Sequence, residues 1–120
     1  VVGGAGSLFV APGVQLVDTP EFPEFIRAAA SAARDLHSDY VAGHAGAGLD
    51  WTFLSPPAMF GPHDPNADAP RSGRYRLGGD EVMFAGPAPA TISRADLAVA
   101  ILDEIEKPAH LRARFTVAAA

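Results

Sequence analysis

The chain has 120 residues, of which 48% are hydrophobic and 19% charged, with a formal net charge of −5 and no cysteine. This length suits one domain spanning residues 1–120, and the apolar fraction is too high for general disorder. Few, scattered basic residues exclude a phosphate-binding stripe for nucleic acid, and the absence of cysteine excludes disulfides and thiolate metal sites.

The amino-terminal residues carry no targeting signal that we recognise. No apolar run approaches the roughly 18 to 20 residues that cross a bilayer, and no basic segment precedes an apolar signal core. We therefore predict no membrane partner and a cytoplasmic location. Residue 1 is valine, and residues 1–4 resemble the end of a buried strand entering a glycine turn, so we expect the chain to begin inside a fold.

The first third of the chain predicts two short strands and a long helix. Extended pieces at 8–10 and 14–17 flank the turn sequence Ala11-Pro12-Gly13. A helix is expected from Pro20 to Gly46, because proline and acids open it and apolar residues then recur every three or four positions. Its apolar face is mostly alanine, which suits close packing on a sheet. The residues of that face are Phe25, Ala29, Ala33, Leu36, Tyr40 and His44.

The most informative stretch is 49–62, where an apolar strand, 49–54, passes directly into a turn of small, rigid and aromatic residues. In open α/β sheets the ligand lies beyond the carboxyl ends of the strands, so this turn is expected at a crevice wall. A long loop follows at 61–72, and then a predicted hairpin of 73–77 with 81–84.

The clearest local signature is a helix start at Ser93. Serine is a strong N-cap, Asp96 stands three residues further on as in a capping box, and Ile92 can contact Leu97. The predicted helix runs from Ser93 to Lys107, and a short strand at 114–117 follows. Strands and helices that alternate in this way predict an α/β fold.

Taken in order, five pieces resemble the atypical short-chain dehydrogenase/reductase family, specifically its NAD(P)-binding NmrA-like members. These pieces are VVGGAGSL, PGVQLVDTPEFP, LDWTFLSPPAMFGP, SGRYRLGGDEV and ISRADLAVAILDEIEKPAHLRARFTV. The resemblance implies the carboxyl-terminal half of a Rossmann-type doubly wound parallel sheet, without the amino-terminal βαβ half that holds the cofactor phosphates. The family's G-x-x-G-x-x-G loop has no counterpart, because Pro12 and extended residues follow the first glycines where a helix would be needed.

By the same resemblance, two turns form the nicotinamide side of a cofactor crevice, and two further residues line a substrate pocket. The implied cofactor is NAD(P)(H), with NADP favoured over NAD, and the implied partners are this dinucleotide and a small-molecule substrate. The cofactor-binding residues would be Gly3, Gly4, Ala5, Gly6, Ser7, Ser55, Pro56, Pro57 and Ala58, and the pocket residues Met59 and Phe60.

Catalytic residues stay unassigned. The wider superfamily uses Tyr-x-x-x-Lys to transfer a proton, but here His44 stands four residues after Tyr40, and a core-edge pair is the simpler interpretation. His63, Asp64 and Asp68 are suitable metal ligands by type. A proline-rich solvated loop explains them more simply, so we predict no metal.

These features favour an NAD(P)H-dependent oxidoreductase or an epimerase-like enzyme that acts on a small molecule. Two alternatives stay open: a non-catalytic NAD(P)-binding sensor or regulator, and a truncated interaction module without a ligand. Because a missing half would leave apolar faces uncovered, we also expect the isolated chain to self-associate.

Overall fold

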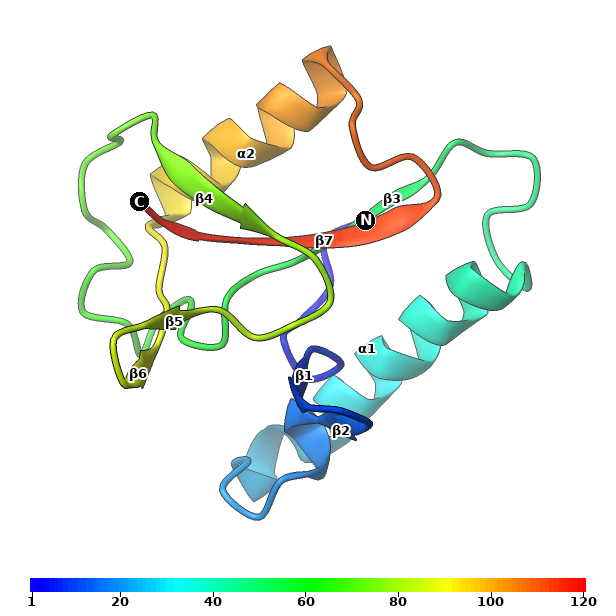
Figure 1. Cartoon of the computed structure of the whole chain (residues 1–120), viewed down its shortest axis with the longest axis horizontal. Helices are drawn as coiled ribbons and strands as arrows, with labels where there is room; N and C mark the ends of the chain where they lie inside the picture. Colours follow the sequence, from blue (N-terminus) through cyan, green and yellow to red (C-terminus); the bar gives the residue numbers. More distant parts are fainter.

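A three-stranded mixed sheet forms the centre of the computed structural model, which describes residues 1–120 (Figure 1). The strand order is β3 (Thr52–Ser55), β7 (Ala113–Ala119) and β4 (Tyr75–Gly78). β3 runs parallel to β7, with Leu54 opposite Phe115. Val2 forms a parallel bridge to Leu54 and so extends the parallel part of the sheet beyond β3. The predicted α/β class with a parallel sheet is therefore confirmed for these segments.

The other edge of the sheet departs from the prediction. β4 pairs antiparallel with β7, with Leu77 opposite Val117, so the expected hairpin of 73–77 with 81–84 is wrong. The β7 residues that β4 pairs with include Thr116, Val117 and Ala118, which are buried in the sheet, so this pairing adds β4 to the core. Glu81 instead forms an isolated bridge with Phe9, and the nearby hairpin joins β5 (Phe84–Ala85) to β6 (Ala88–Pro89).

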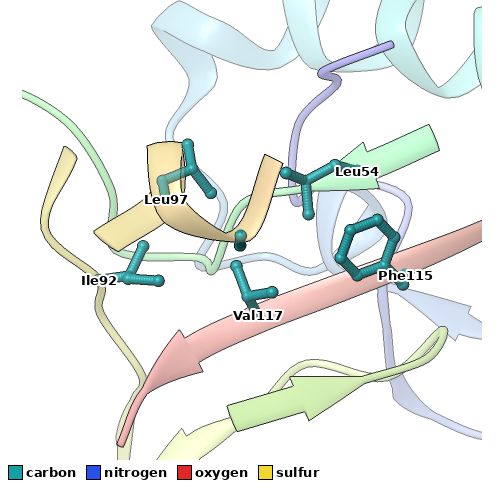
Figure 2. Packing of buried hydrophobic residues seen from close by; sticks show 6 residues of the cluster. Leu54, Ile92, Leu97, Phe115 and Val117 are labelled. Carbon is teal, nitrogen blue, oxygen red and sulfur yellow. The ribbon is translucent and has the colours of Figure 1, made fainter. Parts of the chain in front are cut away.

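Helices cover both faces of the sheet, as a doubly wound arrangement requires (Figure 1). α2 (Arg94–Glu106) begins at the predicted N-cap, where the Ser93 hydroxyl accepts a hydrogen bond from the Asp96 amide at 3.0 Å. The main core lies between α2 and the sheet, as Figure 2 shows. Its buried residues are Leu54, Ile92, Leu97, Ala100, Phe115 and Val117.

α1 (Glu24–Ala42) packs on the opposite face and is shorter than predicted. It ends at Gly43, whose positive φ of 81° is a left-handed cap conformation that glycine adopts without strain. The rings of His37 and Tyr40 lie 5.0 and 6.3 Å from the ring of Phe53, the strand residue that faces away from α2.

The predicted apolar face of α1 is wrong in part, since Phe25 is 80% exposed and Leu36 is also exposed. Two arginines of α1 bind residues outside the helix and so determine which side of it faces the rest of the chain. Arg34 donates to the Asp18 carboxylate at 2.8 Å, and Arg27 donates to the Val17 carbonyl. Both partners lie in η1 (Leu16–Asp18), which follows the antiparallel pair β1 (Phe9–Ala11) and β2 (Val14–Gln15). No helix combines the length and the apolar character that a membrane span needs.

Candidate functional site

The two turns predicted to bind cofactor begin side by side at one edge of the sheet. The Gly3 amide donates to the Leu54 carbonyl at 2.8 Å, so the turn 3–7 leaves the sheet next to the turn 55–58. Gly3 also permits this closeness, because a Cβ there would overlap the ring of Phe53. Ser7 and Ser55 are buried, with 3% and 0% of their surface exposed. The structure thus brings together the two turns that the sequence pointed to.

Arg114, which the sequence analysis did not single out, joins these turns. Its Nη1 donates to the hydroxyl of Ser7 at 2.8 Å and to the hydroxyl of Ser55 at 3.2 Å. Its Nη2 donates to the Ser7 carbonyl at 3.2 Å, and its Nε to the Asp80 carboxylate at 2.8 Å. One guanidinium therefore contacts both turns and the segment after β4.

The Arg114 guanidinium is unusually deeply buried for a charged group. Only 1% of the Arg114 side chain is exposed, whereas its partner Asp80 is 64% exposed. Removing a guanidinium from water is costly unless hydrogen bonds satisfy it, and here the two serines supply much of that compensation. The sequence contained one signal for this contact, because Arg114 is a charged residue within an otherwise apolar strand. That signal becomes informative only once the strand is known to be central, where the arginine must be buried and paired.

The nearest titratable group on α1 is His37. Burial lowers the pKa of its imidazole below 6.5, and the positive charge of Arg114 lowers it further, while Asp80 acts in the opposite direction. At neutral pH the imidazole is therefore uncharged, and Arg114 is the fixed positive charge of the cluster.

The backbone oxygens around the cluster are already engaged. Thr116 donates its hydroxyl hydrogen to the Ser55 carbonyl at 2.7 Å, and the side-chain Nε2 of Gln15 donates to the Ser7 carbonyl at 3.1 Å. These contacts fix the backbone of both turns from β7 and β2.

A cavity of about 640 Å³ adjoins this cluster at Asp80. Its wall is formed by the β1–β2 hairpin and by the chain from Asp80 to Phe84. The lining includes Phe9, Val10, Pro12, Asp80, Val82 and Phe84. Glu81 also lines it, so the pocket combines apolar side chains with two carboxylates.

The remaining predicted site residues lie elsewhere. Met59 bridges to Thr91, and Phe60 packs against the α2 core, so both lie towards the start of α2. Their role in a substrate pocket stays a prediction. The Tyr40 ring lies beside Trp51, with centroids 5.2 Å apart and planes tilted by 49°. His44 lies beyond the end of α1 and is 74% exposed next to Asp39, so the predicted core-edge pair with Tyr40 does not form.

The residues weighed as metal ligands have contacts within their own loop and with α2. The Asp64 carboxylate accepts the Asn66 amide at 2.9 Å, and Asp68 pairs with Arg94 on α2. No three histidine or acidic side chains of the chain come together in a group that could hold a metal ion.

Comparison with known proteins relates the chain to reductase-like and epimerase-like proteins. No family model matches. The uncharacterized protein YwnB of Bacillus subtilis (strain 168) is 43% identical over 120 residues, which are 98% of this chain and 52% of YwnB. The chain thus spans about half the length of this curated relative.

Three crystal structures are similar over the same extent. A "putative epimerase" from Bacteroides thetaiotaomicron is 38% identical with a TM-score of 0.85, covering 98% of this chain and 51% of that one. A "putative NADH-flavin reductase" from Streptococcus pneumoniae is 34% identical with a TM-score of 0.84, covering 100% and 54%. A "putative exported protein" from Burkholderia pseudomallei is 42% identical, also at 0.84, covering 98% and 53%. The chain therefore shares an α/β fold with half of proteins described as a putative epimerase and a putative NADH-flavin reductase, and its cytoplasmic location stays a prediction.

Proposed function

We propose that this chain forms the carboxyl-terminal, nicotinamide-side part of an NAD(P)H-dependent oxidoreductase of the atypical short-chain dehydrogenase/reductase type, with an NmrA-like fold. The observation that carries the proposal is that Arg114 joins the turns 3–7 and 55–58. Both turns lie at the carboxyl ends of neighbouring parallel segments. That edge is where open α/β sheets bind ligands. Similarity to the Streptococcus pneumoniae and Bacteroides thetaiotaomicron proteins supports the same class.

The residues present fit a nicotinamide carboxamide. Gly4 leaves open space where a Cβ would stand, so the backbone can approach a flat ring. Ser7 and Ser55 lie buried behind this surface, where Arg114 binds both hydroxyls and holds the two turns together. When bound, the reduced nicotinamide supplies the hydride. The chain would orient that group through the two turns and exclude water from it.

Enzyme assays test the proposal directly. The chain, alone and joined to whatever coding sequence precedes Val1, is incubated with NADH or NADPH and with FMN, quinones or small carbonyl compounds. We expect the absorbance of the reduced nicotinamide to fall steadily with at least one acceptor. Comparison of NADH with NADPH decides between the Streptococcus pneumoniae description and the preference that the family resemblance implies.

The outcomes separate the alternatives. Dinucleotide binding without turnover would identify a sensor, and no binding in either form would leave an interaction module. Ser7→Ala should reduce kcat/KM by roughly tenfold, because the turn loses the hydrogen bond from Arg114 that holds it in position. Ser38→Ala on the exposed side of α1 is the matched control and should have no effect.

A further inference from the structure

The cavity beside Asp80 has two walls, and backbone hydrogen bonds hold them together. The Phe9 amide donates to the Asp80 carbonyl at 2.8 Å, and the Val82 amide donates to the Phe9 carbonyl at 2.9 Å. One wall is the β1–β2 hairpin, and the other is the chain from Asp80 to Phe84. Because Phe9 ties the walls to each other, the cavity of about 640 Å³ is formed before any ligand enters it.

The two carboxylates of this cavity differ in what they contact. Asp80 accepts a hydrogen bond from Nε of Arg114 at 2.8 Å, so a buried guanidinium offsets its charge. Glu81 is exposed and forms an ion pair with no basic side chain of the chain. The residues that line the cavity include no lysine, arginine or histidine. The cavity therefore carries one negative charge that the chain leaves uncompensated.

Aromatic rings belong to both walls. Phe9 lies on the hairpin, and Phe84, which is 48% exposed, lies on the other wall. The face of an aromatic ring attracts a cation, because the ring carries partial negative charge there. Val10, Pro12 and Val82 complete the apolar lining, which suits the hydrocarbon part of a small molecule.

We propose that this cavity binds a small organic cation, namely an amine or quaternary ammonium group on an apolar or aromatic body. Glu81 supplies the opposite charge, and the rings of Phe9 and Phe84 favour a cation beside them. An anion of the same size should bind poorly, because Arg114 is only 1% exposed and no other basic group lines the cavity. The proposal goes beyond the proposed function, since it concerns a ligand that binds without a dinucleotide.

The first experiment compares three probes of similar shape: phenethylamine, phenethyl alcohol and 3-phenylpropionate. Each is titrated into the chain at neutral pH, and backbone amide signals are followed by NMR. We expect the amine to bind roughly threefold more tightly than the alcohol, and the carboxylate to bind most weakly. The signals that move should be those of residues 9–13 and 80–84. Equal affinity for all three probes, or shifts confined to the apolar cavity at Leu49 and Ile105, would overturn the proposal.

The second experiment removes the charge. Glu81→Gln should weaken binding of phenethylamine by roughly fivefold and leave binding of phenethyl alcohol unchanged. Glu21→Gln is the matched control, because it removes the same charge from an exposed residue outside the cavity and should change neither affinity. Equal weakening by the two variants would mean that the amine responds only to the net charge of the chain, and would overturn the proposal.

The third experiment removes an aromatic face. Phe84→Leu keeps the wall apolar but should weaken binding of phenethylamine by roughly threefold, and of phenethyl alcohol by less. Equal losses for the two probes would reject the role of the ring. None of these titrations contains a dinucleotide. Amine binding without nicotinamide turnover would therefore support this site and reject the proposed function, and turnover without amine binding would do the reverse.

Discussion

The imidazole ring of His110 lies flat on the ring of Phe115, with centroids 4.3 Å apart and planes 8° from parallel. Glu104, near the end of α2, holds His110 in place. Its carboxylate contacts the His110 ring at 3.0 Å and accepts the backbone amides of Ala109 and His110 at 2.9 and 2.7 Å. The end of α2 is thereby attached to the central strand β7.

Replacement of Glu104 should therefore destabilise the chain more than its position near a helix end suggests. Glu104→Ala leaves two backbone amides without their acceptor, and we expect a loss of about 1–3 kcal/mol in the free energy of unfolding. Urea titration followed by circular dichroism measures it. Glu106→Ala, an exposed site two residues later, is the control. Equal effects of the two changes would contradict the attachment.

Asp96 should make the chain sensitive to acid. Burial raises the pKa of its carboxyl, but hydrogen bonds from Gly73 and Ser72 outweigh this and hold it below 3.8. The unfolded chain therefore binds the proton more readily, so stability is full above pH 3.8 and declines as pH falls through the lower, folded pKa. Thermal melts from neutral to acid pH should show a flatter decline in Asp96→Asn. Asp68→Asn, at an 88% exposed site, should keep the slope of the unaltered chain.

Tyr75 should ionise unusually late. The hydrogen bond from its hydroxyl to Asp103 at 2.7 Å raises its pKa to about 12, and burial adds to the shift. In Asp103→Asn the pKa should fall towards 10, because the acceptor has lost its charge. Phenolate absorbance during alkaline titration measures this in a Tyr40→Phe background, which leaves one tyrosine. A midpoint that does not move would contradict the bond.

Gly3 and Gly4 should respond oppositely to alanine, although both were predicted to bind cofactor. A methyl group at Gly3 would overlap the ring of Phe53, which is 1% exposed, whereas a methyl group at Gly4 would have no atom within 4 Å beyond its chain neighbours. Gly3→Ala should cost about 1–3 kcal/mol through overpacking. Gly4→Ala should melt within a few degrees of the unaltered chain in differential scanning calorimetry. Similar melts for both variants would show that the turn relaxes easily.

The uncovered apolar surface should make the isolated chain associate with itself. A cavity of about 560 Å³ near Val1, Val2 and Leu49 has mostly apolar walls, and Ile105, which lines it, is 69% exposed. We expect the mass from light scattering to rise with concentration and to rise less in Ile105→Asn. Leu102→Asn changes an exposed α2 residue outside that cavity and is the control. A monomer at every concentration would contradict the expectation.

Local signals predicted the parts of the fold that local chemistry determines. The N-cap at Ser93 and the change from β3 to the 55–58 turn each depend on residues that are adjacent in sequence, and the structure contains both. The inner face of α1 was not predictable in this way, because Arg27 and Arg34 are recruited by η1, which the spacing of apolar residues does not reveal. The ion pair of Arg34 with Asp18 and the hydrogen bond of Arg27 to the Val17 carbonyl outweighed the helical pattern.

The pairing of β4 and the role of Arg114 failed for a related reason. Proximity in sequence favoured a hairpin for β4, but β4 pairs instead with β7, a strand that is buried over most of its length and lies in the centre of the sheet. Arg114 reads as an ordinary surface arginine until β7 is known to lie between two strands. Its partners Ser7 and Ser55 stand 107 and 59 positions away, a separation that no local pattern encodes.

The central place of β7 has a consequence for the order of folding. Every strand it joins is synthesised before it, yet β3 and β4 have no contact with one another in the sheet except through it. Loops of this length must close before their contacts can stabilise anything, which slows folding. The turns 3–7 and 55–58 should therefore stay loosely ordered while the chain is being synthesised. They should become joined only when β7 is complete, because Arg114 of β7 contacts both Ser7 and Ser55.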